Sequence, residues 1–134
     1  MKALIDTNVF LEILLAQEQS EEAKKLLVNV ECHEFYLTDF TIHSIGLILF
    51  RQRLDSKFAR FIADIVGAGI GVLSLPILEM ERVVAVVQKY TLDFDDAYQY
   101  AVAEKHGLRI VSYDSHFDKT NLGRTTPCKI IGHI

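Results

Sequence analysis

Short apolar runs alternate with longer amphipathic segments along this chain, and the alternation limits the folds that it can adopt. Four runs have the length and apolar character of buried strands, at residues 2–5, 34–37, 70–75 and 108–113. About thirty residues with a helical pattern separate most of them. Strands joined by helices pair in parallel, and the helices then cover both faces of the sheet. We therefore predict an α/β fold, a three-layer α/β/α sandwich around a parallel sheet of four to five strands, with residues 128–132 as the fifth strand and residues 1–134 as a single domain.

Capping residues and helix breakers set the expected helix bounds. Ser20 precedes a segment with acids in its first turn, Pro76 suits the first turn of another, and Gly107 suits the end of a third. The expected helices cover residues 8–15, 20–30, 40–53, 56–69, 76–90 and 95–106.

Composition narrows the classes of function. Half of the residues are hydrophobic, which excludes a disordered chain, and the net charge is −4. A basic field over the whole protein is absent, so contact with nucleic acid needs a local patch. No apolar run reaches the ~18 residues of a membrane-spanning helix, and no signal peptide is recognised. We expect a cytoplasmic protein in which Cys32 and Cys128 are reduced, buried thiols, with a disulfide as the alternative.

Carboxylates stand where the predicted strands end. Asp6 and Asp114 follow the first and fourth strands, and Asp39 follows the second. Asp95 and Asp96 begin the helix that runs back before the fourth strand, so the start of that helix lies at the same sheet edge. Ligands of open parallel sheets bind at this edge. The spacing therefore predicts that acids far apart in sequence meet in one cleft.

Clustered carboxylates raise each other's pKa values unless a counter-charge is present. A hard divalent cation such as Mg²⁺ provides that charge, prefers oxygen ligands and activates water for attack on a phosphodiester. The alternative is structural, because an Asp at any one of these positions can cap a helix or begin a turn.

Two stretches, "ALIDTNVFLEILL" and "LDFDDAYQYAVAEKHGLRIVSYDSHFD", together resemble the PIN domain over nearly the whole chain. This family includes the toxin ribonucleases of VapBC-type toxin–antitoxin pairs. The resemblance implies an α/β/α sandwich with Mg²⁺- or Mn²⁺-dependent cleavage of single-stranded RNA. It also implies a homodimer and a possible antitoxin partner.

The resemblance also assigns candidate site residues. Asp6, Asp96 and Asp114 match the family's first, third and last acids, which implies that they are catalytic and hold the metal ion. Asn8 matches a polar residue that orients the first acid, and Thr7 is a further candidate contact for water or a ligand.

One family position differs in this chain. The second acid, commonly Glu in a "T-x-x-E" stretch, is replaced by Ser44. Either Asp39 or Asp95 supplies the missing carboxylate, or the protein is a weak nuclease or a binding module for RNA or a protein. A phosphatase of the haloacid-dehalogenase type is a further alternative, but it would need Asp where Asn8 stands. His116 lies beside the last acid, where a solvated loop histidine is the more common outcome.

Overall fold

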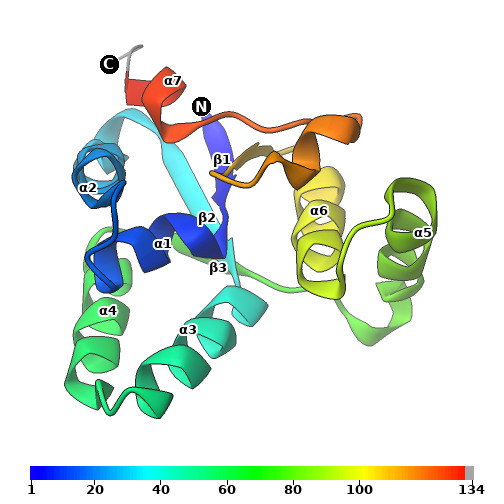
Figure 1. Ribbon diagram of the computed structural model, residues 1–134. Coiled ribbons are helices and arrows are strands. Elements are labelled where there is room, and N and C mark those ends of the chain that lie inside the picture. Colours follow the sequence, from blue (N-terminus) through cyan, green and yellow to red (C-terminus); the bar gives the residue numbers. More distant parts are fainter. Residues whose placement is uncertain (132–134) are drawn as a thin grey trace.

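A computed structural model, in which residues 1–131 are described, contains one parallel sheet of four strands (Figure 1). The strands are β1 (Lys2–Ile5), β2 (Glu34–Thr38), β3 (Gly71–Leu73) and β4 (Arg109–Val111). Their order in the sheet is β3-β2-β1-β4, and every pairing is parallel. Strand β1 is central, because it pairs with β2 on one side and with β4 on the other.

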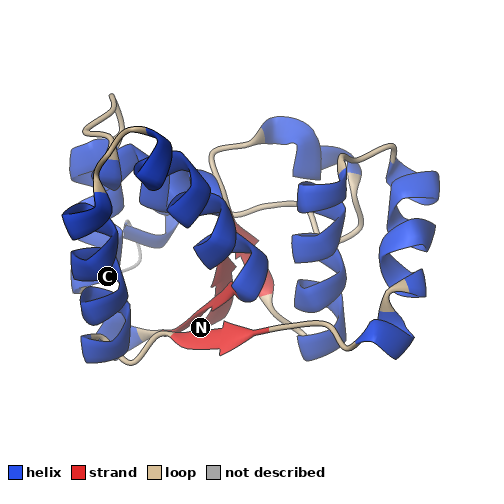
Figure 2. Cartoon of the chain, turned by 90° about the horizontal axis from the view of Figure 1, so that it is seen from below, coloured by secondary structure: helices blue, strands red, loops and turns tan. Residues whose placement is uncertain are grey.

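Helices cover both faces of this sheet (Figures 1 and 2). One face carries α1 (Thr7–Leu14), α2 (Ser20–Val28), α3 (Asp39–Arg51), α4 (Asp55–Gly67) and the short α7 (Pro127–Ile131). The other carries α5 (Glu81–Tyr90) and α6 (Phe94–His106). Three-residue 3₁₀ turns at Val30–Cys32 and Ile77–Glu79 and a longer one at Ser115–Lys119 complete the elements. The predicted three-layer α/β/α sandwich is confirmed.

The side-chain alternation of β1 divides the core into two. Ala3 and Ile5 point into the cluster beneath α1 to α4, and Leu4 points into the cluster beneath α5 and α6. All three are fully buried. A strand with both faces covered is apolar throughout, as expected for a parallel sheet between helical layers.

The predicted fifth strand at residues 128–132 is wrong over the part that the structure describes. Residues 127–131 form α7, and residue 132 lies outside the described residues. Pro127 suits the first turn of a helix, and Ile130, three residues on, reaches the core. Among the described residues, the sheet beyond β4 gains only a bridge between Val111 and Thr125. A short apolar run fits a strand and a helix equally well, which explains the error.

The expected helix at residues 76–90 is also shorter in the structure. Pro76 is extended, with ψ at 153°, and is followed by the 3₁₀ turn Ile77–Glu79. Helix α5 begins only at Glu81. Ile77 and Leu78 are exposed at this turn, so they make no core contacts that would stabilise a regular helix there.

The two cysteines are free, but the prediction that they are buried is wrong. Both side chains are exposed. Cys32 lies in the 3₁₀ turn before β2, and Cys128 lies on α7 between the buried residues Pro127 and Ile130.

Within residues 1–131, no helix has the length and apolarity that crossing a bilayer requires.

Gly71 provides a test of the packing at the sheet edge. A Cβ atom at this position would lie 2.6 Å from Cδ1 of the Tyr36 ring on the neighbouring strand. Gly71→Ala should therefore lower the free energy of unfolding by about 1–3 kcal/mol, as overpacking does elsewhere. Gly67→Ala is the matched control, because nothing lies within 4 Å of its added Cβ atom. The control should be neutral or stabilising by up to about 1 kcal/mol. Urea unfolding of both variants measures the difference, and equal stabilities would contradict the predicted clash.

Candidate metal centre at the carboxyl edge of the sheet

Asp6 lies at the point where β1 becomes α1. Its backbone N–H donates to Val111 O at 2.9 Å, which joins the ends of β1 and β4. Its carboxylate does not cap α1, so the capping alternative is wrong at this position. Instead, Gln99 Nε2 donates to Oδ1 at 2.8 Å and Ser112 Oγ donates to Oδ2 at 2.5 Å. The Asp6 carboxylate is thus buried, and a neutral donor from another element holds each oxygen.

Burial is the main influence on the protonation of Asp6. It raises the pKa of the carboxyl above its ordinary value, and the nearby charge of Asp114 raises it further. The hydrogen bonds from Ser112 and Gln99 act in the opposite direction, because they favour the ionised form. A positive charge near Asp6 would therefore stabilise its ionised form.

Asp96 occupies the first turn of α6 and is also buried. Burial, followed by the negative charges of Asp6, Asp114 and Asp95, raises the pKa of its carboxyl from 3.8 to about 7. The hydrogen bond with His116 lowers the pKa in part. Asp6 after β1 and Asp114 after β4 therefore both act on the charge of Asp96, although the three residues are far apart in sequence.

Asp114 follows β4 and begins the 3₁₀ turn Ser115–Lys119. Its Oδ1 accepts the backbone N–H of His116 at 2.8 Å, so this carboxylate does cap a turn. The same oxygen also lies 3.1 Å from His116 Nδ1. Asp114 is only half-buried, and it keeps an open side toward solvent.

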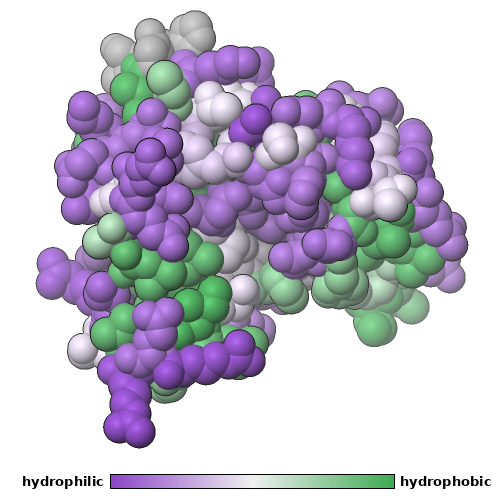
Figure 3. Space-filling view, in the orientation of Figure 1, coloured by the Kyte–Doolittle hydropathy of each residue, from purple (hydrophilic) through white to green (hydrophobic). Residues whose placement is uncertain are grey.

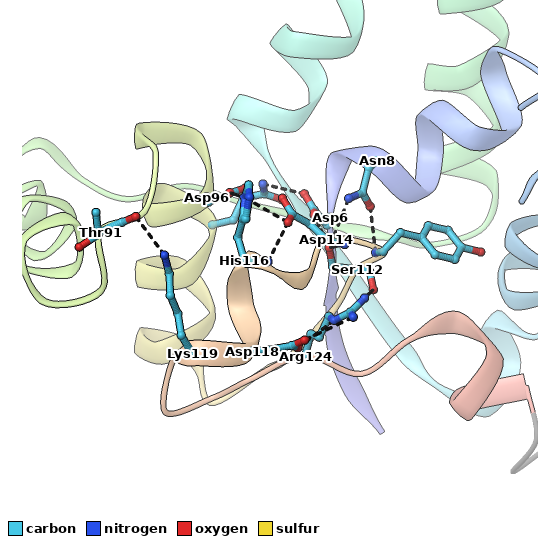
Figure 4. A network of polar contacts seen from close by, with 12 residues as sticks. Asp6, Asn8, Thr91, Asp96, Ser112, Asp114, His116, Asp118, Lys119 and Arg124 are labelled. Carbon is cyan, nitrogen blue, oxygen red and sulfur yellow. Dashed lines mark hydrogen bonds and ion pairs between the residues drawn. The ribbon is translucent and has the colours of Figure 1, made fainter.

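His116 faces both carboxylates at the mouth of the site (Figure 4). Its Nδ1 lies 3.4 Å from Asp96 Oδ2 and 3.1 Å from Asp114 Oδ1. Ligand atoms of these three residues all lie within 4.8 Å of one another. Two carboxylates and an imidazole fit the donor chemistry of a divalent cation. Asp6 is not part of this triplet, although its charge acts on Asp96.

Ser112 connects the first and last predicted acids, and the sequence interpretation did not include it. Its Oγ donates to Asp6 and accepts from the backbone N–H of Asp114 at 2.8 Å. Asn8 Nδ2 donates to the same oxygen at 3.3 Å, while Asn8 Oδ1 accepts the backbone N–H of Tyr113. Asn8 thus holds the segment that carries Asp114. The polar residue inside the apolar run "IVSYD" is the signal that was available.

Gln99 is the second residue that the sequence interpretation missed. It is 1% exposed, contacts Asp6 through Nε2, and accepts at Oε1 from Thr41 Oγ1 at 3.4 Å. Thr41 in turn shares a hydrogen bond of 2.9 Å with Thr7, so Thr7 belongs to the support beneath the site. Gln99 lies three residues after Asp96 on α6, and this helical spacing would have placed both on one face.

The carboxylates suggested as substitutes for the missing Glu have different surroundings. Asp39 Oδ1 accepts hydrogen bonds from Tyr98 Oη at 2.8 Å and from the backbone N–H of Phe40 at 2.9 Å. These contacts do not involve Asp6, Asp96 or Asp114. Asp95 is exposed and lies within ligand distance of Asp93 and Asp96. The residue before α6 is Asp93, so the expectation that Asp95 or Asp96 caps this helix is wrong. Ser44 is half-buried on α3, one turn after Thr41.

Comparisons with known proteins agree with this architecture. Residues 3–122 match the sequence family described as the PIN domain. A toxin–antitoxin complex from Klebsiella pneumoniae contains a chain with a TM-score of 0.71 at 21% identity, over 93% of this chain and 97% of that one. PAE2754 from Pyrobaculum aerophilum has a TM-score of 0.68 at 20% identity, over 99% and 94%. FitAcB from Neisseria gonorrhoeae has a TM-score of 0.64 at 20% identity, over 96% of this chain and 99% of that one. No curated protein matches by sequence.

The raised pKa of Asp96 predicts how stability depends on pH. Between pH 3.8 and about 7 the folded protein binds more protons at Asp96 than the unfolded chain does. Stability is therefore lost as the pH rises through this window. Asp96→Asn removes the ionisation, so the metal-free variant should melt roughly 5 °C above wild type at pH 8 and close to it near pH 4.

Thermal unfolding in EDTA at several pH values measures this difference. Asp64→Asn is the control, because Asp64 is exposed and its pair with Arg60 on α4 contributes little. A variant of Asp96 that melts below wild type at pH 8 would contradict the assigned burial of charge.

Proposed function

The chain belongs to the PIN-domain family, and from this premise we propose that it is a metal-dependent endoribonuclease that cleaves single-stranded RNA. The observation that carries the proposal is the convergence of Asp6, Asp96 and Asp114 at one sheet edge, where burial and mutual repulsion raise the pKa values of the first two. Such a site is stabilised by a cation, and Asp114 keeps one side open to a substrate.

Asp6, Asp96 and Asp114 would hold Mg²⁺ or Mn²⁺. When bound, a divalent cation activates water and neutralises charge that develops on phosphate oxygens. The chain's own contribution is orientation. Ser112 and Gln99 fix the two oxygens of Asp6, and the 3₁₀ turn after β4 fixes Asp114. Carboxylates held in this way keep their positions without the reorganisation that flexible side chains would require.

An RNA substrate must approach a protein whose net charge is −4. The phosphate backbone is therefore recognised locally rather than by a general field. Arg124 lies near the site, where Nη1 donates to the backbone oxygen of Ser112 and Nε pairs with Asp118. As part of this proposal, the protein acts in the cytoplasm, as the sequence analysis also predicts.

A protein partner is the second part of the proposal. Apolar side chains gather on the surface around α3 and α4 (Figure 3). Leu47 and Phe50 are exposed there, at an open groove of about 670 Å³ that Ile42 and Phe58 also line. An exposed apolar surface of this kind suits a homodimer contact or an antitoxin. The similarity to a chain of a toxin–antitoxin complex supports the toxin role.

Ser44 favours one other function. A hydroxyl at the position of the usual Glu removes a formal charge from the site, which weakens binding of a hard cation. The alternative is therefore a catalytically weakened PIN-domain protein that binds RNA or a protein partner.

The test of the proposed activity uses purified protein, Mn²⁺ or Mg²⁺ and an unstructured RNA. Asp6→Asn should lower the cleavage rate at least about 100-fold, because it removes a charge while keeping the shape; loss of an outer partner alone costs 10–100-fold in metal sites. Asp95→Asn is the matched control and should cost less, since Asp95 is exposed. EDTA should abolish cleavage. Activity that survives both EDTA and Asp6→Asn would indicate a contaminant, and no activity on several RNAs would favour the binding alternative.

A glutamate at position 44, where the family commonly has an acid, tests whether this residue faces the cation. Ser44→Glu should tighten divalent-ion binding by about tenfold, or 1.4 kcal/mol, because it adds an anionic oxygen ligand. Isothermal titration calorimetry on wild type and variant measures this. Unchanged or weaker binding would show that residue 44 does not face the cation.

A further inference from the structure

The imidazole of His116 stands beside the carboxylates of Asp96 and Asp114, and the family assignment does not account for it. We propose that His116 is a direct ligand of the divalent cation and that it shifts the preference of the site from Mg²⁺ toward Mn²⁺ and other transition metals. This inference rests on the proposed function, because it concerns the same cation.

The distances around His116 Nδ1 suit shared coordination. For an octahedral ion with ligands at about 2.1 Å, adjacent ligand atoms lie about 3.0 Å apart. Nδ1 is 3.1 Å from Asp114 Oδ1 and 3.4 Å from Asp96 Oδ2. These three residues would therefore hold the ion through one nitrogen and two oxygens.

The backbone holds the imidazole in place. The N–H of His116 donates to Asp114 Oδ1, and the next residue, Phe117, is fully buried in the core beneath α5 and α6. Thr120 Oγ1 donates to the carbonyl of Phe117 at 2.6 Å and closes the turn. The side chain of His116 itself is 61% exposed, so ions and water reach it directly.

The donor set predicts the metal preference. Mg²⁺ favours oxygen ligands and retains its waters, whereas imidazole nitrogen suits transition metals. With Ser44 in place of a carboxylate, one hard anionic donor is absent from the family's set. His116 supplies a neutral nitrogen donor instead, and the site becomes a mixed nitrogen and oxygen site.

An ion pair is the competing explanation of the same contacts. A protonated imidazole would neutralise Asp96 and Asp114 and would occupy the place of the cation. The two explanations differ in sign. If His116 is a ligand, its removal weakens Mn²⁺ binding and affects Mg²⁺ little; if it is only a counter-charge, its removal tightens the binding of both ions.

Calorimetric titration of metal-free protein with Mn²⁺ and with Mg²⁺ at constant pH tests the proposal, on wild type, His116→Gln and the control His106→Gln. His106 is exposed at the opposite end of α6 from Asp96. We expect His116→Gln to weaken Mn²⁺ binding by about tenfold and Mg²⁺ binding by less than about threefold. The control should leave both unchanged. Pulsed electron paramagnetic resonance of the Mn²⁺ form should show coupling to a ¹⁴N nucleus in wild type and in the control, and not in His116→Gln.

Two results would overturn the proposal. Tighter binding of both ions by His116→Gln would assign the histidine as a counter-charge, and an unchanged Mn²⁺ to Mg²⁺ ratio without nitrogen coupling would remove it from the coordination sphere. In either case, RNA cleavage by wild type would leave the proposed nuclease intact. Failure of wild type to bind any divalent ion and to cleave RNA would overturn both.

Discussion

Parallel pairing of β1 on both of its edges determines where every functional side chain lies. The pairing with β4 brings Ile5 opposite Val111, and the backbone bond from Asp6 to Val111 continues it by one residue. Asp6 and Asp114 thereby leave the sheet at one edge. Helix α6 runs back along the other face, so its first turn brings Asp96 to the same edge. If this pairing slipped by one residue, Leu4 would exchange core faces with Ala3 and Ile5, so the two packed cores protect the register of the site.

Burial and function oppose each other at this edge. Asp6 and Asp96 are buried, which raises the pKa values of both carboxyls and makes the ionised forms unfavourable. Two neutral donors stabilise the ionised form of Asp6, because Gln99 and Ser112 each donate a hydrogen bond to one of its oxygens. Within residues 1–131, the Asp96 carboxylate is hydrogen-bonded to His116 alone, and its pKa is about 7. A carboxylate left in this state gains the most from an added cation, so the same burial that destabilises the metal-free fold favours metal binding.

Periodicity and strand-end acids made most of the architecture predictable, while partners formed only by tertiary packing were not. Strand β1 has the bounds expected from sequence, and the helix ending at His106 before Gly107 is also as expected. The roles of Ser112 and Gln99 depend on which buried acid each one meets across more than ninety residues, and local patterns carry no such information. The predicted fifth strand at residues 128–132 was wrong for a different reason. "CKII" has no period long enough to distinguish strand from helix, and Pro127 decided the outcome.

The hydrogen bond from Ser112 to Asp6 joins residues 106 positions apart, and this separation determines when the acidic site can assemble during synthesis. Strand β1 leaves the ribosome well before its partner β4 and the residues after β4 that complete the acidic edge. Contacts between residues so distant form only after the intervening chain is available. A nascent chain therefore carries Asp6 before Ser112, Asp114 and His116 have been made, and its acidic site is not yet assembled. For the proposed nuclease, late assembly of the sheet would mean that the chain is inactive while it is still being translated.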